Sequence, residues 1–251
     1  MLRSALAAIA VAVLASASAP VAAAQKYVVL SLIGDAMTLV TYRASVGSML
    51  DRNDHQSVPL GDPAFDRAAA KAVEDALLRV DRENSVIVLG SSSPDLFTDQ
   101  ARLFDGTRVV LGDELGTSLR NSGASQMILI TKHRGEARVQ MRRGSSGGGY
   151  LEGLGFYIDR QMQTRRVDTG ESGTGFLGPF VYIKVSLVDL ASATVLREDI
   201  ISASRGFSAA RSETNDPWSA LTADQKALML TRVLQGELGR VVTRIVATMN
   251  P

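Results

Sequence analysis

The residue types that could carry out catalysis do not combine into a complete site in this sequence. Gly34-Asp35-Ala36 has alanine where the Gly-Asp-Ser arrangement of a serine esterase needs its nucleophilic hydroxyl. Asp168-Thr169-Gly170 matches the triplet of an aspartic protease, but that chemistry needs two carboxylates sharing a proton, and the triplet occurs once. Ser172 lies in Gly-Glu-Ser-Gly, not in the Gly-x-Ser-x-Gly of a nucleophile elbow. We therefore expect no catalytic residue and a protein that is not an enzyme.

The sequence also contains no complete metal or cofactor site. It has no cysteine and two histidines, His55 and His133. His55 follows the carboxylates of Asp51 and Asp54, but no second imidazole is fixed nearby, and the cations beside His133 repel a metal. Gly147–Gly149 could cradle an anion, but the lysine and hydroxyl residue of a phosphate-binding loop are missing. We expect neither a metal nor a cofactor.

The composition excludes several classes of protein. The 251 residues include 27 Lys+Arg and 26 Asp+Glu, so the formal net charge is +1. A charge this small argues against a protein that wraps nucleic acid with a broad basic surface. The absence of cysteine excludes both a disulfide framework and a lipid-anchored cysteine. At 45% hydrophobic and 21% charged residues, the composition is typical of a folded globular chain.

Residues 1–24 predict a secretory signal peptide. Arg3 supplies a positive charge, residues 5–15 are apolar but too few to span a bilayer, and small residues lead up to a cleavage site near Ala24. Cleavage there leaves 251 − 24 = 227 residues with 26 basic and 26 acidic side chains. An uncleaved membrane anchor is the alternative. We expect a periplasmic protein of the cell envelope in which residues 25–251 form a single α/β domain.

Apolar periodicity after the leader predicts alternating strands and helices. Strands are expected at 27–33, 37–43, 85–89, 127–132, 180–190 and 195–202. Helices are expected after a cap at Asp62, at 95–104, at 111–121, and from Thr222 onward, where Gln225 completes a capping box. Residues 51–56 are predicted to form a polar loop. Together these elements predict an α+β sandwich, with a mixed sheet, flanking helices and a long Gly-rich insertion.

The predicted insertion, residues 144–178, holds ten of the 22 glycines. Gly153-Leu-Gly155 within it lacks the third glycine of a dinucleotide-binding fingerprint. Glycine lets a backbone approach a partner closely, and aromatic rings supply contact area. The predicted partner-binding residues are Tyr150, Phe156, Tyr157, Phe176, Arg142 and Arg143. The expected partner is an envelope protein or a second copy of the chain. The alternatives are a peripheral contact with anionic headgroups of the outer membrane or acidic glycans, and a disordered excursion.

The second half of the sequence has a pattern that resembles a known domain. A helix end leads into a strand, and a hairpin follows later, in the segments Leu119–Ser125, Met127–Thr131, Val181–Leu190 and Val195–Ser202. Over roughly residues 110–247 this pattern resembles an α/β domain of bacterial envelope proteins. The family includes the curli-secretion pore protein, the outer-membrane activators of penicillin-binding proteins and the N-terminal domain of the Tol-system propeller protein. The resemblance implies partner binding or oligomerisation, without a catalytic residue.

One position departs from the family pattern, because Ala193 stands where the hairpin turn usually has glycine. Residues 151–160 and 169–176 are also similar to uncharacterised exported proteobacterial proteins. Two other functions remain open. One is an oligomeric secretion or pore component associated with the outer membrane. The other is a small-ligand-binding protein or hydrolase whose site is not recognisable in the sequence.

Overall fold

A computed structural model describes residues 24–44, 51–91, 93–142, 144–165, 170, 172–208 and 216–247. The predicted signal peptide lies outside the described residues apart from Ala24, and Arg143 lies outside them as well. The described chain forms a mixed sheet of 12 strands flanked by helices, which confirms the predicted fold class. Within these ranges, the helices fall short of the length and apolarity needed to cross a bilayer.

The helices are α1 (Ala64–Val80), α2 (Asp95–Thr98), α3 (Asp113–Asn121) and α4 (Ala223–Ala247), with short 3-10 helices η1 (Gln100–Leu103) and η2 (Pro217–Ala220). The first strands are β1 (Lys26–Ser31), β2 (Ala36–Thr41), β3 (Asp54–Pro59), β4 (Ser85–Leu89), β5 (Phe104–Asp105), β6 (Arg108–Val109) and β7 (Gln126–Lys132). The remaining strands are β8 (Arg134–Glu136), β9 (Val139–Gln140), β10 (Ser145–Ser146), β11 (Tyr150–Arg165), β12 (Ser172–Asp189), β13 (Thr194–Ser204) and β14 (Phe207–Ser208).

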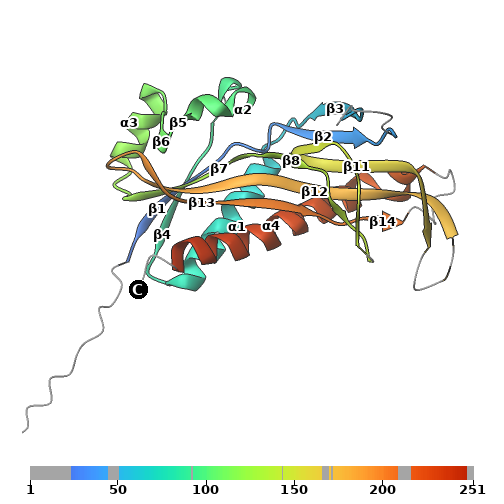
Figure 1. Cartoon of the computed structure of the whole chain (residues 1–251). Coiled ribbons are helices and arrows are strands. Elements are labelled where there is room, and N and C mark those ends of the chain that lie inside the picture. The colour runs from blue at the N-terminus through green and yellow to red at the C-terminus, as the bar shows by residue number, and fades with distance from the viewer. Residues whose placement is uncertain are drawn as a thin grey trace, which may run out of the picture.

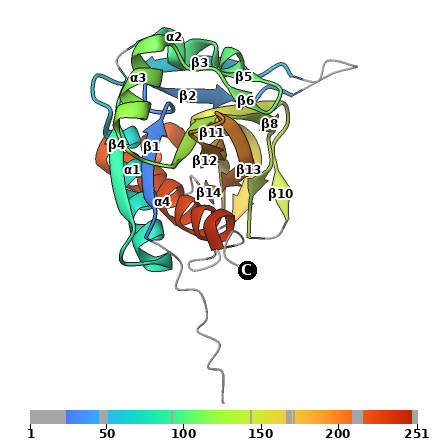
Figure 2. The same ribbon diagram turned by 90° about the vertical axis from the view of Figure 1, so that its left-hand side faces the viewer.

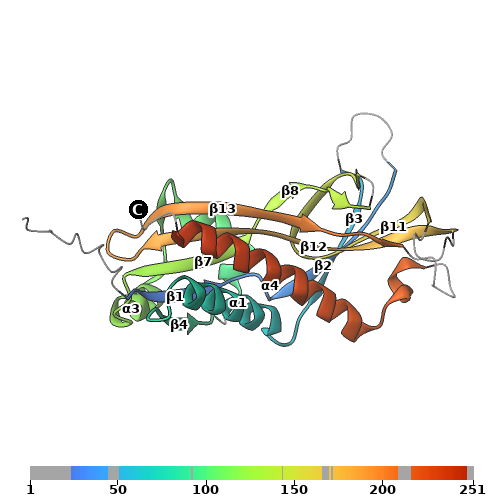
Figure 3. The same cartoon turned by 90° about the horizontal axis from the view of Figure 1, so that it is seen from below.

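Different elements cover the two faces of the sheet. Helices α1 and α4 lie side by side on one face and bury the largest apolar cluster beneath them (Figures 1 and 3). On the other face, α2, η1 and α3 cover the end built from β1, β4 and β7. The β8–β9 segment covers the same face at the end built from β11 and β12. The sheet is therefore buried on both sides along much of its length, which explains its near-continuously apolar strands.

The predicted insertion is the centre of the sheet. Strands β11 and β12 are its longest strands and pair in antiparallel register, with Gly155 opposite Phe180. Their side chains alternate between the two faces, so that Phe156 packs under the helices while Tyr157 packs under β9. The expectation of an insertion was wrong. The frequent glycines of this segment are typical of a loop. They also interrupt the apolar pattern by which two strands buried on both faces would be recognised.

Two smaller expectations were also wrong. Residues 54–59 form β3, an exposed strand that pairs with β2 at the edge of the described sheet (Figure 2), and its first three residues overlap the polar loop predicted at 51–56. Four of its six residues are polar and the two apolar ones are adjacent, so no apolar alternation marks the strand. Asp62 makes no side-chain cap on α1 and instead forms an ion pair with Arg67 at 2.7 Å. The capping box of α4 is confirmed, since Gln225 N donates to Thr222 Oγ1 at 3.2 Å and Thr222 N donates to Gln225 Oε1 at 2.9 Å.

The turn between β12 and β13 carries the first testable prediction. Ala193 has a φ of 54°, a left-handed conformation that costs a residue with a Cβ about 1–2 kcal/mol. Ala193→Gly is therefore expected to raise the free energy of unfolding by about 1 kcal/mol. The reverse substitution, Gly106→Ala, is the matched control, because Gly106 has a φ of 59° and open space around it. Chemical denaturation should show stabilisation of the first variant and destabilisation of the second; loss of stability in Ala193→Gly would contradict the argument.

Candidate functional site

The six predicted partner-binding residues do not form one exposed surface in the structure. Phe156, Tyr157 and Phe176 are each 0% exposed, so their rings are part of the core and cannot supply contact area to a partner. The expectation for these three residues was wrong, because they sit on strands covered on both faces. Tyr150 is half-buried, with the Arg134 guanidinium 4.8 Å above its ring. Of the two predicted arginines, Arg142 is exposed and lines the groove described below, and Arg143 lies outside the described residues.

The Gly147–Gly149 loop does not form an open anion cradle. Gly148 N donates to Tyr157 Oη at 3.0 Å, and Asn53 Nδ2 donates to Gly148 O at 2.6 Å. The next amide, Tyr150 N, donates to the Asp51 carboxylate at 3.2 Å. Burial raises the pKa of Tyr157, so its hydroxyl keeps the proton that it donates to Gly148 O at 3.4 Å. The protein's own side chains therefore occupy two of the amides that an anion would need, those of Gly148 and Tyr150.

A surface hollow of about 1330 Å³ lies where four distant segments meet. It is lined by Gln140–Arg142, Met162–Arg165, Ala203–Ser208 and one face of α4 from Arg232 to Arg240. We call this hollow the arginine groove. Figure 3 shows how α4 runs along β12 and β13 and so brings its outer face to the ends of these strands.

The apolar pattern of α4 determines which of its residues face the groove. Leu230, Leu234 and Leu238 recur every four residues and are fully buried against the sheet. The same spacing of four residues relates Arg232, Gly236 and Arg240, which lie two residues after the leucines. A shift of two residues rotates a side chain by about 200° around the helix axis, so these three face away from the leucines. Burying the leucine stripe therefore places both arginines and the glycine on the exposed face.

The groove has a strong positive charge although the chain as a whole is nearly neutral. Among the residues that the structure describes, its lining contains one acidic residue, Glu237, and five arginines. The arginines are Arg142, Arg165, Arg205, Arg232 and Arg240. Arg240 forms an ion pair with Glu237. Within the described ranges, the other four lack a carboxylate within 4 Å. Elsewhere many surface arginines are neutralised, as Arg244 is by Asp199.

The floor of the groove is apolar and adaptable. Met162 and Phe207 are 37% and 36% exposed, which is high for side chains of their type. Met141 is half-buried and packs against the backbone of Gly206, where an added Cβ would lie 3.2 Å from Met141 Cε and closer still to its sulfur. A methionine has three rotatable bonds and a polarisable sulfur, so it conforms to partners of different shape.

A second polar cluster lies where β1 and β7 end, a place where α/β sheets often bind ligands. Here Lys132 Nζ forms an ion pair with Asp35 at 2.6 Å. The Gln100 amide bridges the diverging strands: it donates to Leu32 O at 2.5 Å and accepts from Lys132 N at 2.7 Å. Lys132 and Gln100 already use their polar groups within this cluster, and the adjacent hollow of about 320 Å³ is much smaller than the groove. The cluster therefore stabilises the strand ends.

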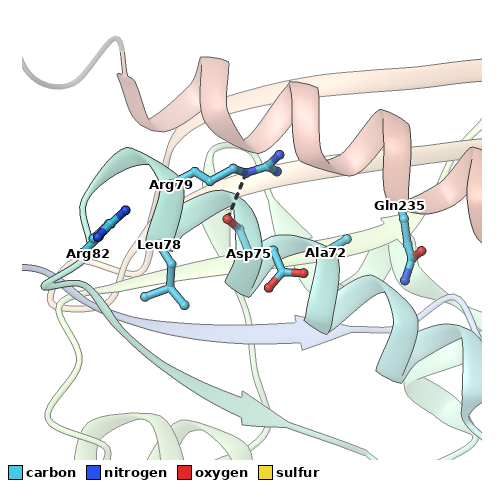
Figure 4. Close-up of a pocket in the computed structure, with 6 residues that line it drawn as sticks. All are labelled: Ala72, Asp75, Leu78, Arg79, Arg82 and Gln235. Atoms are coloured by element: carbon cyan, nitrogen blue, oxygen red, sulfur yellow. Dashed lines mark hydrogen bonds between the residues drawn. The ribbon is translucent and has the colours of Figure 1, made fainter.

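Figure 4 shows a third hollow, of about 620 Å³, between α1 and α4. Two of its three charged lining residues, Asp75 and Arg79, are bonded within α1. Arg79 Nε donates to Asp75 O at 3.0 Å, and the Asp75 carboxylate pairs with Lys71 at 2.9 Å. The described residues contain no group of three or more side chains suited to a metal ion. The arginine groove is thus the best candidate for a functional site.

Comparison with known proteins identifies no family. No protein-family model matches the chain, and no curated protein matches it. The resemblance of residues 110–247 to an envelope domain therefore stays a prediction.

Several solved bacterial structures show a weak similarity to this chain, and three of them are described below. A Xanthomonas campestris protein of the family DUF330 is 11% identical, with 90% of this chain and 84% of that chain covered and a TM-score of 0.35. A homologue of neuraminyllactose-binding hemagglutinin from Helicobacter pylori is 7% identical, with coverage of 87% and 84% and a TM-score of 0.36. The dodecameric PelC of Paraburkholderia phytofirmans is 12% identical, with coverage of 88% and 91% and a TM-score of 0.33. Similarity this weak carries no inference about function.

Proposed function

We propose that this chain is an exported, non-catalytic protein of the bacterial envelope whose arginine groove binds an acidic segment of a protein partner. The observation that supports the proposal is the convergence of five arginines from four distant segments on one hollow with a single acidic residue among its described lining. Opposite charge on a partner would lower the repulsion among these arginines and steer its approach. Arg142 is the residue that this site shares with the partner-binding set predicted from the sequence.

The composition of the groove favours a protein partner over a lipid surface or a uniform polyanion. Protein interfaces are enriched in arginine, methionine and aromatic residues and depleted in lysine. The described lining of the groove contains arginine, Met141, Met162 and Phe207, and it contains no lysine. Arginine also forms bidentate hydrogen bonds with carboxylates, which gives a geometric preference for Asp and Glu side chains.

The proposed location rests on the sequence of residues 1–24. A short basic start, an apolar stretch and small residues before Gln25 form the pattern of a cleaved signal peptide, and a cysteine-free chain needs no disulfide to fold in the periplasm. N-terminal sequencing of the protein from a bacterial periplasmic extract should give Gln25 as the first residue. A chain that starts at Met1 and stays in the membrane fraction would instead indicate an uncleaved anchor.

The binding proposal is tested with a labelled peptide of glutamate residues and its lysine counterpart. Fluorescence anisotropy should show binding of the acidic peptide only, with an affinity that falls as salt is raised. Neutralising Arg165, Arg205 and Arg232 to glutamine should weaken this binding about tenfold, since each exposed ion pair adds a modest increment.

The matched control neutralises three exposed arginines outside the groove, Arg52, Arg82 and Arg108. This variant has the same net charge as the groove variant, so it should bind the acidic peptide almost as the unmodified protein does. Equal loss in both variants would show that only net charge matters and would overturn the proposal. Absence of binding in the unmodified protein would overturn it too.

A further inference from the structure

The face of α4 in the arginine groove has a gap in its row of side chains, because Gly236 carries none. Gly236 is exposed in the middle of this helix, one turn from Arg232 on one side and from Arg240 on the other. A Cβ built at Gly236 meets no atom within 4 Å, so the space above it is open. Arg240 Nε lies 3.4 Å from Gly236 O, which places the guanidinium base beside the gap.

The folded chain itself gives no reason for glycine at this position. Glycine in a helix interior is about 1 kcal/mol less favourable than alanine. A Cβ at Gly239, about one turn further along, would meet a neighbour, the flexible end of the Arg79 side chain on α1, with Nη2 3.0 Å away. Gly236 has no such neighbour, so the helix accepts a less stable residue and keeps a space in the middle of the groove.

The surroundings of the gap combine apolar surface with positive charge. Val233 on α4 and the exposed Met162 and Phe207 line the same groove. A partner with carboxylates alone would cover these apolar side chains without any compensating contact. A partner that also has an apolar side chain could bury it among them, and that burial contributes to affinity in proportion to the apolar area removed from water.

From this geometry we infer that the acidic segment bound by the groove is amphipathic, with an apolar side chain seated over Gly236 and carboxylates placed on Arg232 and on Arg240, where the partner competes with Glu237. This inference rests on the proposed function and adds the chemical class of the partner segment. It assigns Gly236 a role in specificity: the absent side chain leaves room for the partner's anchor. The recognised pattern is therefore an apolar residue flanked by Asp or Glu, presented by another protein.

The test compares two synthetic peptides of equal charge, one alternating Glu with Leu and the other alternating Glu with Ser. The unmodified protein should bind the Glu/Leu peptide about tenfold or more tightly than the Glu/Ser peptide, the ratio expected from burial of one leucine side chain. Filling the gap with Gly236→Leu should remove this preference and leave the affinity for the Glu/Ser peptide within about threefold, because the arginines are unchanged.

Folding is controlled in the same experiment. Leucine and alanine both favour helix over glycine, so Gly236→Leu and Gly236→Ala should each keep the circular dichroism spectrum and unfold at a temperature no lower than the unmodified protein. Equal binding of the two peptides by the unmodified protein, or a preference that survives Gly236→Leu, would overturn this inference. If the arginine variants still weaken binding in that case, the proposed function stands without it.

Discussion

Gly155→Ala is expected to destabilise the protein more than any other single methyl addition considered for this chain. Gly155 is buried in β11, where it pairs with Thr38 of β2 in parallel register. An added Cβ would lie 2.8 Å from both the Thr38 carbonyl carbon and Phe180 Cζ, and closer still to the Thr38 oxygen. The collision is with backbone, so a side-chain rotation cannot relieve it, and β2 would have to leave its place in the sheet.

Overpacking a well-packed core typically costs about 1–3 kcal/mol, and a backbone collision belongs at or above the upper end of that range. We expect denaturant unfolding of Gly155→Ala to show a loss of at least about 3 kcal/mol, or no cooperative transition. Gly61→Ala is the control, because a Cβ at Gly61 meets nothing within 4 Å. A Gly155→Ala protein with the stability of this control would contradict the strand register.

Asp66→Ala is the second substitution with a large expected effect. Asp66 lies in the first turn of α1 and accepts hydrogen bonds from Ser31 Oγ at 2.6 Å, Ile33 N at 3.0 Å and Gly34 N at 3.1 Å. It thereby holds the end of β1 against the start of α1. Alanine would leave these three donors without their acceptor in a half-buried place, and we expect a loss of about 2–4 kcal/mol in the free energy of unfolding.

The pH dependence of stability reports whether burial or hydrogen bonding has the larger effect on the pKa of Asp66. Burial raises the pKa of this carboxyl more than its hydrogen bonds lower it, so the folded state holds the proton to higher pH than the unfolded state does. Its contribution to stability is therefore complete below the unfolded-state pKa of about 4 and is lost as pH rises through the raised folded-state pKa. Asp66→Asn should flatten this part of the stability profile. An unchanged slope would show that Asp66 titrates normally.

Much of the fold could be predicted from local patterns. The strand at 85–89 has the bounds predicted from its β-branched residues, and α4 starts at its capping box. Elements without an apolar period were missed, as β3 was. Strands β11 and β12 were missed for a different reason: Gly153 and Gly155 suggest a loop, yet the first has a φ of 69° and the second permits close approach of β2. Both requirements come from tertiary packing, which a local sequence pattern does not show.

The arginine groove could not be predicted from the sequence for the same reason. Its arginines lie in segments separated by up to about a hundred residues, and only the folded chain brings Arg142 and Arg205 to the hollow that α4 lines. One signal was present: Arg232, Gly236 and Arg240 recur every four residues on the polar face of a clearly amphipathic helix. That spacing predicts a basic stripe, but it does not show which strands would face it.

The most direct test of the account locates the bound peptide by nuclear magnetic resonance of methyl-labelled methionines. Met141 and Met162 line the arginine groove, whereas Met127 is fully buried at the other end of the sheet and Met37 lies on β2. Titration with the Glu/Leu peptide should shift the methyl signals of Met141 and Met162 in a saturable way and leave those of Met127 and Met37 in place. Shifts confined to Met127 or Met37, with the groove signals unmoved, would contradict the assignment of the arginine groove as the binding site.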